Sequence, residues 1–335
     1  MPSTQTVLIA TRGSALALAQ ANTVLGRCRA VFPERSFELR IIKTTGDKLQ
    51  TASLASSELP KGLFTKEIEE ALVRAEADLA VHSLKDLPTQ LPDGLSLGTV
   101  LPRADVRDVL VHKRQETEDR GQRSEVRGPK EPASGLDLLP KGATVATSST
   151  RRRAQLLDLR PDLNIVPIRG NVGTRLRKVA EQSELDATIL AAAGLQRLGF
   201  EMREDGLLVG PPESSVPPGV RAVPLEPEEM LPCVGQAAIG IEVRERDART
   251  GPICALLNHA ETFQCILAER AFLTAMGGGC QLAVAAYAQI VGGQIWLRAV
   301  SFLGQKPVRG ETRGAWTEAE ALGRELAAGL IQGKA

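Results

Sequence analysis

Aromatic residues are scarce in this chain, at 3% of 335 residues, and neither sign of charge is in excess. Lysine and arginine number 41 and aspartate and glutamate 40, which leaves a net charge of +1. The lack of aromatics argues against a platform for stacking nucleic-acid bases. The charge balance gives no general attraction to nucleic acid or to a membrane surface. An anionic ligand must therefore be bound by local clusters of Arg and Lys.

Cysteine and histidine are also few. The five cysteines form no Cys-x-x-Cys pair, and together with the three histidines they show no metal-ligand spacing, so we expect no metal site. An odd number of scattered cysteines indicates a reducing compartment. No basic leader precedes the first apolar run, and no apolar run approaches about 18 residues. These absences predict a cytoplasmic protein with no membrane and no nucleic-acid partner.

The most informative stretch is residues 79–89. The apolar run at 79–81 predicts a buried strand, the chain turns polar through Lys85 and Asp86, and Pro88 stops any helix. Ligands bind beyond the carboxyl ends of strands in open α/β sheets, so an adjacent cation and carboxylate indicate a functional site. In the alternative interpretation Asp86 caps a turn and Lys85 is solvated. The stretch alone leaves both interpretations open.

Arginines recur where predicted strands meet predicted helices. These junction arginines are Arg12, Arg151, Arg152, Arg169 and Arg175. A cation in the first turn of a helix opposes the helix dipole, at a cost of a few tenths of a kcal/mol. Several of them at equivalent points indicate a cleft that holds a polyanion, most simply carboxylates bound by guanidinium forks. The alternative is that they are solvated surface arginines.

Cys280 follows three glycines, Gly277 to Gly279. Most cysteines are small buried hydrophobes, but glycines leave the backbone bare for close approach and give the loop reach. The thiol of Cys280 is therefore placed to be loaded covalently.

The rest of the chain suggests domains joined by loops, because 335 residues exceed one typical core. Residues 113–139 are charged and poor in large apolar residues, which predicts a disordered insertion. Residues 200–232 are interpreted as loop-rich, and residues 234–244 alternate like a strand. An amphipathic helix at 261–276, a hairpin, a third strand and a final helix predict a small α+β domain.

Seven stretches then appear in a recognisable order along nearly the whole chain. They are Ile9-Ala-Thr-Arg-Gly-Ser14, Lys61-Gly-Leu-Phe-Thr-Lys-Glu67, His82-Ser-Leu-Lys-Asp-Leu-Pro88, Thr147-Ser-Ser-Thr-Arg-Arg152, Arg169-Gly-Asn-Val-Gly-Thr-Arg175, Asp186-Ala-Thr-Ile-Leu-Ala-Ala-Ala-Gly-Leu195 and Gly278-Gly-Cys-Gln281. In this order they resemble the porphobilinogen deaminase family, also called hydroxymethylbilane synthase. The chain departs from the family pattern at Leu59-Pro60, Ala237, Gly277 (usually Glu) and Ala283, and none of these departures removes Asp86, an arginine or the thiol.

The resemblance implies a transferase of tetrapyrrole and haem biosynthesis. Such an enzyme joins four porphobilinogens head to tail, with loss of ammonia, on a dipyrromethane primer and releases hydroxymethylbilane by hydrolysis. The resemblance implies that the dipyrromethane is attached to Cys280, that Asp86 is the catalytic residue and that the protein acts as a monomer. The residues that it implies for binding cofactor or substrate are Arg12, Ser14, Lys61, Lys85, Ser148, Ser149, Arg151, Arg152, Arg169, Gly170, Arg175, Gln236 and Arg244.

The fold that the resemblance implies is α/β with three domains. Two are doubly wound and like periplasmic binding proteins, and the third is a small α+β C-terminal domain. The expected boundaries are 1–103 with 235–257, which holds Asp86, then 104–234, which binds anions, and 258–335, which holds Cys280.

This fold also allows a ligand-binding module without catalysis, such as a transport receptor or the sensor half of a regulator. A receptor would carry an export signal and a regulator a DNA-binding head, and neither is recognised here. Cys280 together with Asp86 favours the enzyme.

Overall fold

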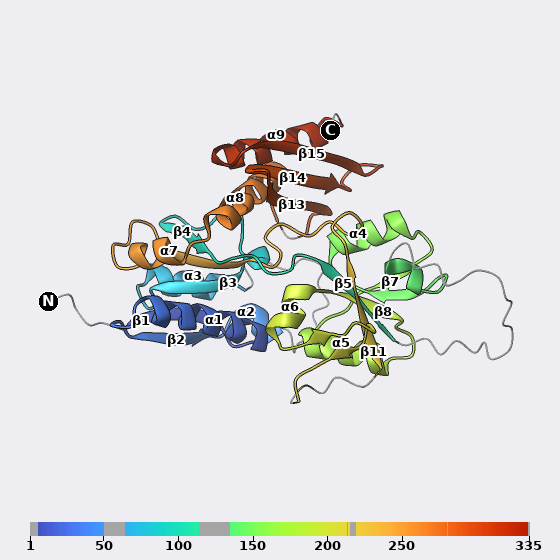
Figure 1. Cartoon of the computed structure of the whole chain (residues 1–335), viewed down its shortest axis with the longest axis horizontal. Coiled ribbons are helices and arrows are strands. Elements are labelled where there is room, and N and C mark those ends of the chain that lie inside the picture. Colours follow the sequence, from blue (N-terminus) through green and yellow to red (C-terminus); the bar gives the residue numbers. More distant parts are fainter. Residues whose placement is uncertain are drawn as a thin grey trace. The chain divides into compact units, whose positions relative to one another are not determined.

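The computed structural model describes residues 6–49, 64–113, 135–212, 214, 219–279 and 281–333. The chain divides into two compact units, Met1–Val106 with Leu231–Ala335, and Arg107–Met230 (Figure 1). Most of the expected insertion at 113–139 lies outside the described residues, as do Lys61 and Cys280. The three expected domain boundaries stay a prediction.

The first unit is built on a five-stranded sheet in the order β2-β1-β3-β12-β4. Strand β12 runs antiparallel to the other four strands. The elements are β1 Val7–Arg12, α1 Ala15–Val31, β2 Phe37–Ile42, α2 Thr45–Leu49, α3 Lys66–Val73, β3 Leu79–Ser83, the 3-10 helix η1 Leu84–Asp86, β4 Leu95–Val100, β12 Ile239–Arg244 and α7 Gly251–Leu257.

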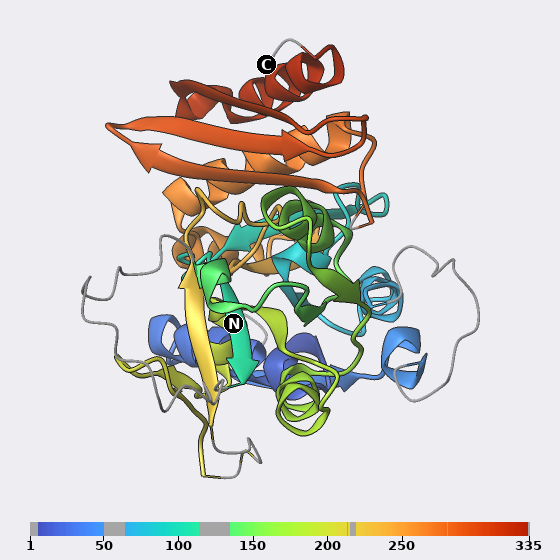
Figure 2. The same cartoon turned by 90° about the vertical axis from the view of Figure 1, so that its right-hand side faces the viewer.

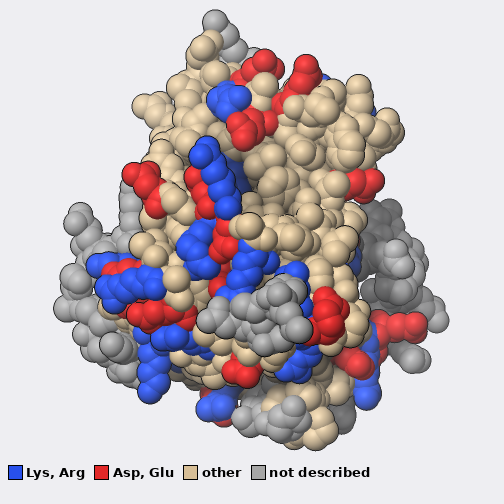
Figure 3. Space-filling model, turned by 90° about the vertical axis from the view of Figure 1, so that its left-hand side faces the viewer, with Lys and Arg blue, Asp and Glu red and all other residues tan. Residues whose placement is uncertain are grey.

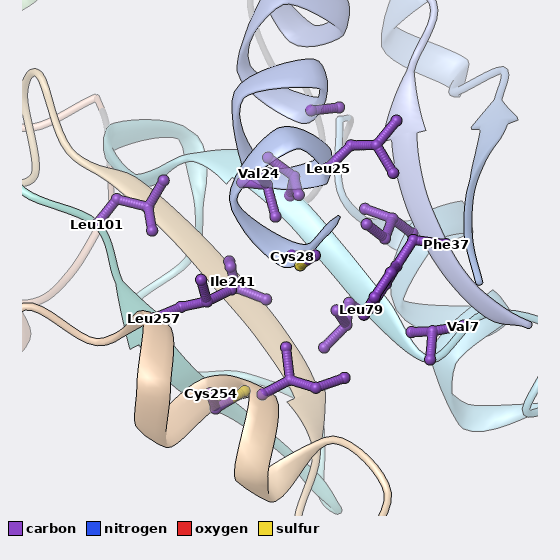
Figure 4. Close-up of a cluster of buried hydrophobic side chains, with 14 of the residues drawn as sticks. Val7, Val24, Leu25, Cys28, Phe37, Leu79, Leu101, Ile241, Cys254 and Leu257 are labelled. Carbon is purple, nitrogen blue, oxygen red and sulfur yellow. The ribbon is translucent and has the colours of Figure 1, made fainter. Parts of the chain in front are cut away.

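Both faces of this sheet are covered by helices, because successive side chains of a strand point to opposite faces. On one face, Ile9 and Leu79 pack with Cys28 of α1 and Cys254 of α7 in one core cluster (Figure 4). On the other face, Ala10 packs with residues of α3. Each fully buried leucine-sized side chain contributes about 1.5–3 kcal/mol to the free energy of unfolding. The sheet is therefore held from both sides, as in a doubly wound fold.

Strand β12 is shorter than the alternation at 234–244 predicts. It begins at Ile239, because Gly235 and Ala237 adopt positive φ angles of 73° and 67° and turn the chain. A left-handed φ favours glycine, so Ala237 adopts a strained conformation.

The second unit holds another five-stranded sheet, in the order β11-β5-β8-β6-β7. Strands β6, β7 and β8 are parallel, and β5 runs antiparallel to β8. Helix α4 packs on one face of the sheet, and α5 and α6 pack on the other. The elements are β5 Asp108–Lys113, η2 Gly135–Leu138, β6 Thr144–Ala146, α4 Thr150–Leu159, β7 Asn164–Val166, α5 Val172–Glu181, β8 Ala187–Ala191, α6 Ala192–Arg197, β9 Glu201–Met202, β10 Leu208–Val209 and β11 Val220–Leu225.

Residues 200–232 are loop-rich, as expected, but sequence analysis missed the strands among them. They contain the short pair β9 and β10 and the six-residue strand β11. Pro224 lies inside β11 and weakens the strand pattern in the sequence, but β11 is an edge strand and needs no partner on its outer side.

The C-terminal part of the first unit is a small α+β domain. A three-stranded antiparallel sheet of β13, β14 and β15 is packed on one face by α8 and α9 (Figure 2). An added Cβ on Gly323 would lie 2.2 Å from the Ala268 carbonyl oxygen, so glycine is needed where these two helices approach. The elements are α8 Ala260–Ala275, β13 Val284–Val291, β14 Gln294–Ser301, β15 Val308–Ala315, η3 Trp316–Glu318 and α9 Ala319–Ile331. The expected fold class is confirmed.

Candidate active site

Four of the predicted residues of the first unit lie at one edge of its sheet. Arg12 ends β1, and Ser14 caps α1 by accepting a hydrogen bond from the Ala17 backbone nitrogen at 3.3 Å. Lys85 and Asp86 follow β3 in η1. Because β1 and β3 are parallel and in register, both strands end at this carboxyl edge. The structure thus brings together residues more than 70 positions apart.

The Asp86 side chain is exposed. Within the described residues its carboxylate makes no hydrogen bond or ion pair. Lys85 beside it is half-buried and engaged in contacts. A carboxylate with open lone pairs can accept a proton from a ligand or offset a positive charge that develops on it.

The backbone around Asp86 is fixed from two sides. The Leu84 nitrogen donates to the Ala238 carbonyl at 3.1 Å. Arg270 of α8 donates to the carbonyls of Leu87 at 3.2 Å and Pro88 at 2.6 Å. The exposed carboxylate is therefore carried by a rigid loop.

Cys280 lies outside the described residues, but the three glycines before it are described and have positive φ angles of 102°, 65° and 112°. An added Cβ on Gly278 would meet the Thr89 hydroxyl oxygen at 3.4 Å. Thr89 is three residues beyond Asp86 in the sequence. The segment that leads to Cys280 therefore lies beside the Asp86 loop.

Arg12 is held by Asp47, which sequence analysis missed. The Arg12 guanidinium forms an ion pair with the Asp47 carboxylate, with the Nε atom 3.2 Å from Oδ1, and lies 4.1 Å from the Phe64 ring centroid. Burial works to raise the pKa of Asp47, but hydrogen bonds from Arg12 and Thr44 hold that pKa below its ordinary value. Asp47 thus orients Arg12 at the edge of the sheet.

In the second unit, the carboxyl ends of β6 and β7 carry the predicted anion-binding residues. The Ser148 hydroxyl donates to the Ile168 carbonyl at 2.7 Å and accepts from the Ile168 nitrogen at 3.0 Å. Ser149 caps α4, accepting from the Arg152 nitrogen at 3.4 Å. Both hydroxyls therefore fix the backbone of the loops.

Arg151 and Arg152 are buried, with 4% and 7% exposure, against one carboxylate. Arg151 Nη1 lies 2.6 Å from Asp108 Oδ2, and Arg152 Nη2 lies 2.7 Å from Asp108 Oδ1. Burial works to raise the pKa of Asp108, but the two guanidinium charges hold it well below its ordinary value. Two positive charges against one negative leave a net charge of +1 in this cluster, which favours an anionic ligand. Asp108 was missed by sequence analysis because it begins β5, far from both arginines in the sequence.

Arg169 and Arg175 flank a tight turn. Gly170 has a φ of 116°, and an added Cβ there would lie 2.6 Å from the Thr174 Cγ2 atom, so only glycine fits. Arg175 Nε donates to the Gly170 carbonyl at 2.8 Å. The Arg169 side chain is exposed and makes no ion pair or hydrogen bond within the described residues. It is the predicted arginine most open to a ligand.

The structure argues against a ligand contact for Gln236. Its side chain is fully buried, and its Nε2 atom donates to the Val106 carbonyl at 2.7 Å. The Cys233 thiol donates to its Oε1 atom at 3.4 Å. Its amide is therefore used inside the protein.

Arg244 was also expected to bind cofactor or substrate, and the structure corrects this. Strand β12 is antiparallel to β3, with Ile239 opposite Ser83 and Val243 opposite Leu79. Arg244 therefore lies at the edge opposite to Asp86. Its guanidinium donates to the Ala77 carbonyl at 2.6 Å and to Asp247 at 2.7 Å, so it holds the fold together.

Asp108→Asn should destabilise the protein strongly, by about 3–5 kcal/mol, because it leaves two buried guanidinium groups without their carboxylate. Since the folded-state pKa of Asp108 is depressed, its stabilisation is present above the ordinary Asp pKa and is lost as the pH falls toward the folded-state value. Urea unfolding at neutral and acid pH measures both effects. Glu320→Gln, which removes an exposed pair with Arg324, should change stability far less. Equal effects of the two variants would contradict this account of Asp108.

Basic and acidic side chains are interspersed on the face shown in Figure 3 and form no continuous patch of one sign there. Among the described residues, no group of three or more His, Cys, Asp or Glu side chains could hold a metal ion. In the same part of the chain, no helix has the length and apolar character needed to cross a membrane.

Two family models match the chain. The first, described as "Porphobilinogen deaminase, dipyromethane cofactor binding domain", covers residues 7–251. The second, described as "Porphobilinogen deaminase, C-terminal domain", covers residues 263–332. Together they account for nearly the whole chain.

Solved structures match the chain only weakly. The periplasmic aliphatic sulphonate binding protein SsuA from Escherichia coli has 13% identity and a TM-score of 0.36, with 80% of this chain and 68% of that chain covered. The OxyR2 regulatory domain from Vibrio vulnificus has 16% identity and a TM-score of 0.39, with 77% and 95% covered. The methionine binding protein MetQ has 12% identity and a TM-score of 0.37, with 76% and 90% covered. Similarities this weak carry no conclusion about function.

Proposed function

The chain belongs to the porphobilinogen deaminase family, and from this premise we propose which of its residues carry out the family's reaction. It is a hydroxymethylbilane synthase, a transferase that condenses porphobilinogen units on a dipyrromethane cofactor in tetrapyrrole biosynthesis. We assign catalysis to Asp86 and cofactor attachment to Cys280. The observation that carries both assignments is that Gly278, two residues before Cys280, lies against Thr89, three residues after Asp86.

The residues present fit a cofactor rich in carboxylates. Glycines 277 to 279 leave the backbone beside Thr89 uncovered, and the exposed Arg169 has no partner within the described residues. When bound, the dipyrromethane supplies the free pyrrole α-carbon to which each new unit is joined. Cys280 would hold it covalently, and Arg12, Lys85 and the arginines of the second unit would bind its acetate and propionate groups.

Asp86 is assigned the proton transfers. Loss of ammonia from porphobilinogen leaves a cationic methylene group, and the exposed Asp86 carboxylate can offset that charge. The same carboxylate can hold a proton on an oxygen and return it during the condensation. Its exposure and its open lone pairs support this role.

The buried pair Arg151 and Arg152 is assigned to electrostatic binding. Asp108 holds both guanidinium groups in place, and the net charge of +1 in the cluster is exerted at the carboxyl edge of β6. Ser148 and Ser149 support this edge through the backbone and are assigned no direct catalytic part.

Arg169→Leu should impair cofactor assembly or chain elongation and leave the thermal stability unchanged. Loss of one charge-assisted hydrogen bond to a ligand carboxylate costs about 1.5–3 kcal/mol, or roughly tenfold to a hundredfold in kcat/KM. Intact mass measures cofactor loading, and steady-state kinetics with porphobilinogen measure turnover.

Arg244→Leu is the matched control at the opposite edge of the first sheet. It should lower the thermal stability and leave kcat unchanged in the protein that folds. The assignment fails if Arg169→Leu has the kinetics of the parent protein, or if Arg244→Leu is the variant that loses elongation.

The proposal also covers the oligomeric state and the cellular location of the protein. We propose that the monomer is the active unit, as expected from the resemblance to the family. Cys28, Cys233, Cys254 and Cys265 are free cysteines, which supports a reducing, cytoplasmic location. Sedimentation of the active protein tests the first property, and cell fractionation tests the second.

A further inference from the structure

Helix α8 contacts the Asp86 loop through two residues one turn apart. Ile266 packs in a buried cluster with Leu84 and Leu87, which flank Lys85 and Asp86. Arg270, four residues later and so on the same face of the helix, donates to two successive carbonyls beyond Asp86. The loop is thus held by an apolar contact and by a guanidinium fork from the same helix face.

The fork has the geometry of a specific interaction. Arg270 Nη1 lies 3.2 Å from the Leu87 carbonyl oxygen and Nη2 lies 2.6 Å from the Pro88 carbonyl oxygen. Both nitrogens belong to one planar group, so the two carbonyls are fixed relative to each other and to the helix. Hydrogen bonds from a charged donor contribute more than those from a neutral donor.

Arg270 is buried, with 9% exposure, and one acid, Glu242, acts on its charge. Burial lowers the pKa of Arg270 to about 10, and the charge of Glu242 works in the opposite direction, so the group stays cationic at neutral pH. Glu242 is fully buried on β12, and its Oε2 atom lies 2.9 Å from His82 Nε2 on β3. Burial also raises the pKa of Glu69, whose charge interacts with that of Glu242. The cation at 270 is thus balanced by an acid that is bound to the strand leading to Asp86.

Helix α8 also leads to the glycine segment before Cys280. Helix α8 ends at Ala275, and Gly277 to Gly279 follow, with Gly278 against Thr89. We propose that Arg270 is a positioning residue for the condensation, which acts through the Leu87 and Pro88 carbonyls to fix the Asp86 carboxylate relative to the helix that leads to Cys280. This inference rests on the proposed role of Asp86, and neither the family match nor the sequence analysis assigns a part to Arg270.

Arg270→Leu replaces the guanidinium group by a shorter apolar side chain and removes both hydrogen bonds. A displacement of about 1 Å at a reacting group costs on the order of a hundredfold in rate, so kcat should fall by about that factor while KM changes much less. Arg270→Lys can donate to one carbonyl but cannot form the fork, so its kcat should lie between those of the parent and of Arg270→Leu.

The matched control is Arg249→Leu. Arg249 also binds an acid and a carbonyl, Asp78 at 3.0 Å and Thr6 at 2.7 Å, but at the opposite edge of the sheet. This variant should lose thermal stability without a change in kcat. A role of Arg270 that is only structural would give the same pattern for both arginines.

The decisive measurement is the double variant Asp86→Asn with Arg270→Leu. If Arg270 acts through Asp86, the double variant should be no slower than Asp86→Asn alone. Additive losses, or a wild-type kcat for folded Arg270→Leu, would overturn the inference and leave the role of Asp86 intact. If Arg270→Leu does not fold, the test is made with Arg270→Lys. A lowered kcat of this variant at a little-changed KM supports the inference. A wild-type kcat of this variant overturns it. A fully active Asp86→Asn would instead overturn the proposed function.

Discussion

Purified Cys280→Ala protein should have the mass of its bare sequence and no synthase activity. The parent protein, made in a host that produces porphobilinogen, should weigh more than its sequence by two porphobilinogens minus two ammonias. It should also colour with an aldehyde reagent for free pyrrole α-positions. Both signals and the activity should disappear together in Cys280→Ala, because the primer has no other point of attachment.

The remaining cysteines are poor alternatives for attachment. Burial raises the pKa of Cys28 and of Cys254 to about 11 and that of Cys265 to about 12. These thiols stay protonated and enclosed at neutral pH, and the thiolate is the reactive form. Cys233 is half-buried and donates its thiol hydrogen to Gln236.

Cys265→Ala is the control, and it should retain the added mass, the colour and the turnover. An adduct mapped by peptide digestion to any cysteine other than Cys280 would contradict the attachment site. So would an unmodified mass for the parent protein from a porphobilinogen-producing host.

Asp86→Asn should lower turnover by at least about a hundredfold, within the range usual for a general acid–base group. The amide has nearly the shape of the carboxylate, but it cannot take up the proton or offset the cationic methylene group. The exposed position of Asp86 means that little packing is lost, so the thermal stability should not change. Single-turnover kinetics with porphobilinogen, together with intact mass, measure the chemical step and the cofactor separately.

The expected pattern for Asp86→Asn is slow turnover with the dipyrromethane still attached. Asp93→Asn, which changes another acid of the first unit outside the site, is the control and should have the parent's kinetics. Near-normal turnover of Asp86→Asn would remove Asp86 from the mechanism, whatever its effect on stability.

Short-range patterns predicted much of this protein. The apolar run at 79–81, the polar turn after it and Pro88 gave a buried strand and an exposed acid, because these features depend on residues next to one another in the chain. The glycines before Cys280 and the Gly170 turn are local in the same way, since positive φ angles are set within a few residues. Near-balanced charge and few aromatics excluded whole classes of partner.

Tertiary structure decided which charges are open to a ligand. Arg151, Arg169 and Arg244 look alike in the sequence, but the first is buried against Asp108, the second is exposed and the third is bound at the far edge of the sheet. No short-range pattern can distinguish them, because their partners come from strands and helices distant in the sequence. The same holds for Arg270, whose contact with the Leu87 carbonyl joins residues 183 positions apart. The sequence alone determined which chemical groups this protein has, and the packing of sheet on helix determined which of them can act, since burial and pairing set the availability of a charge.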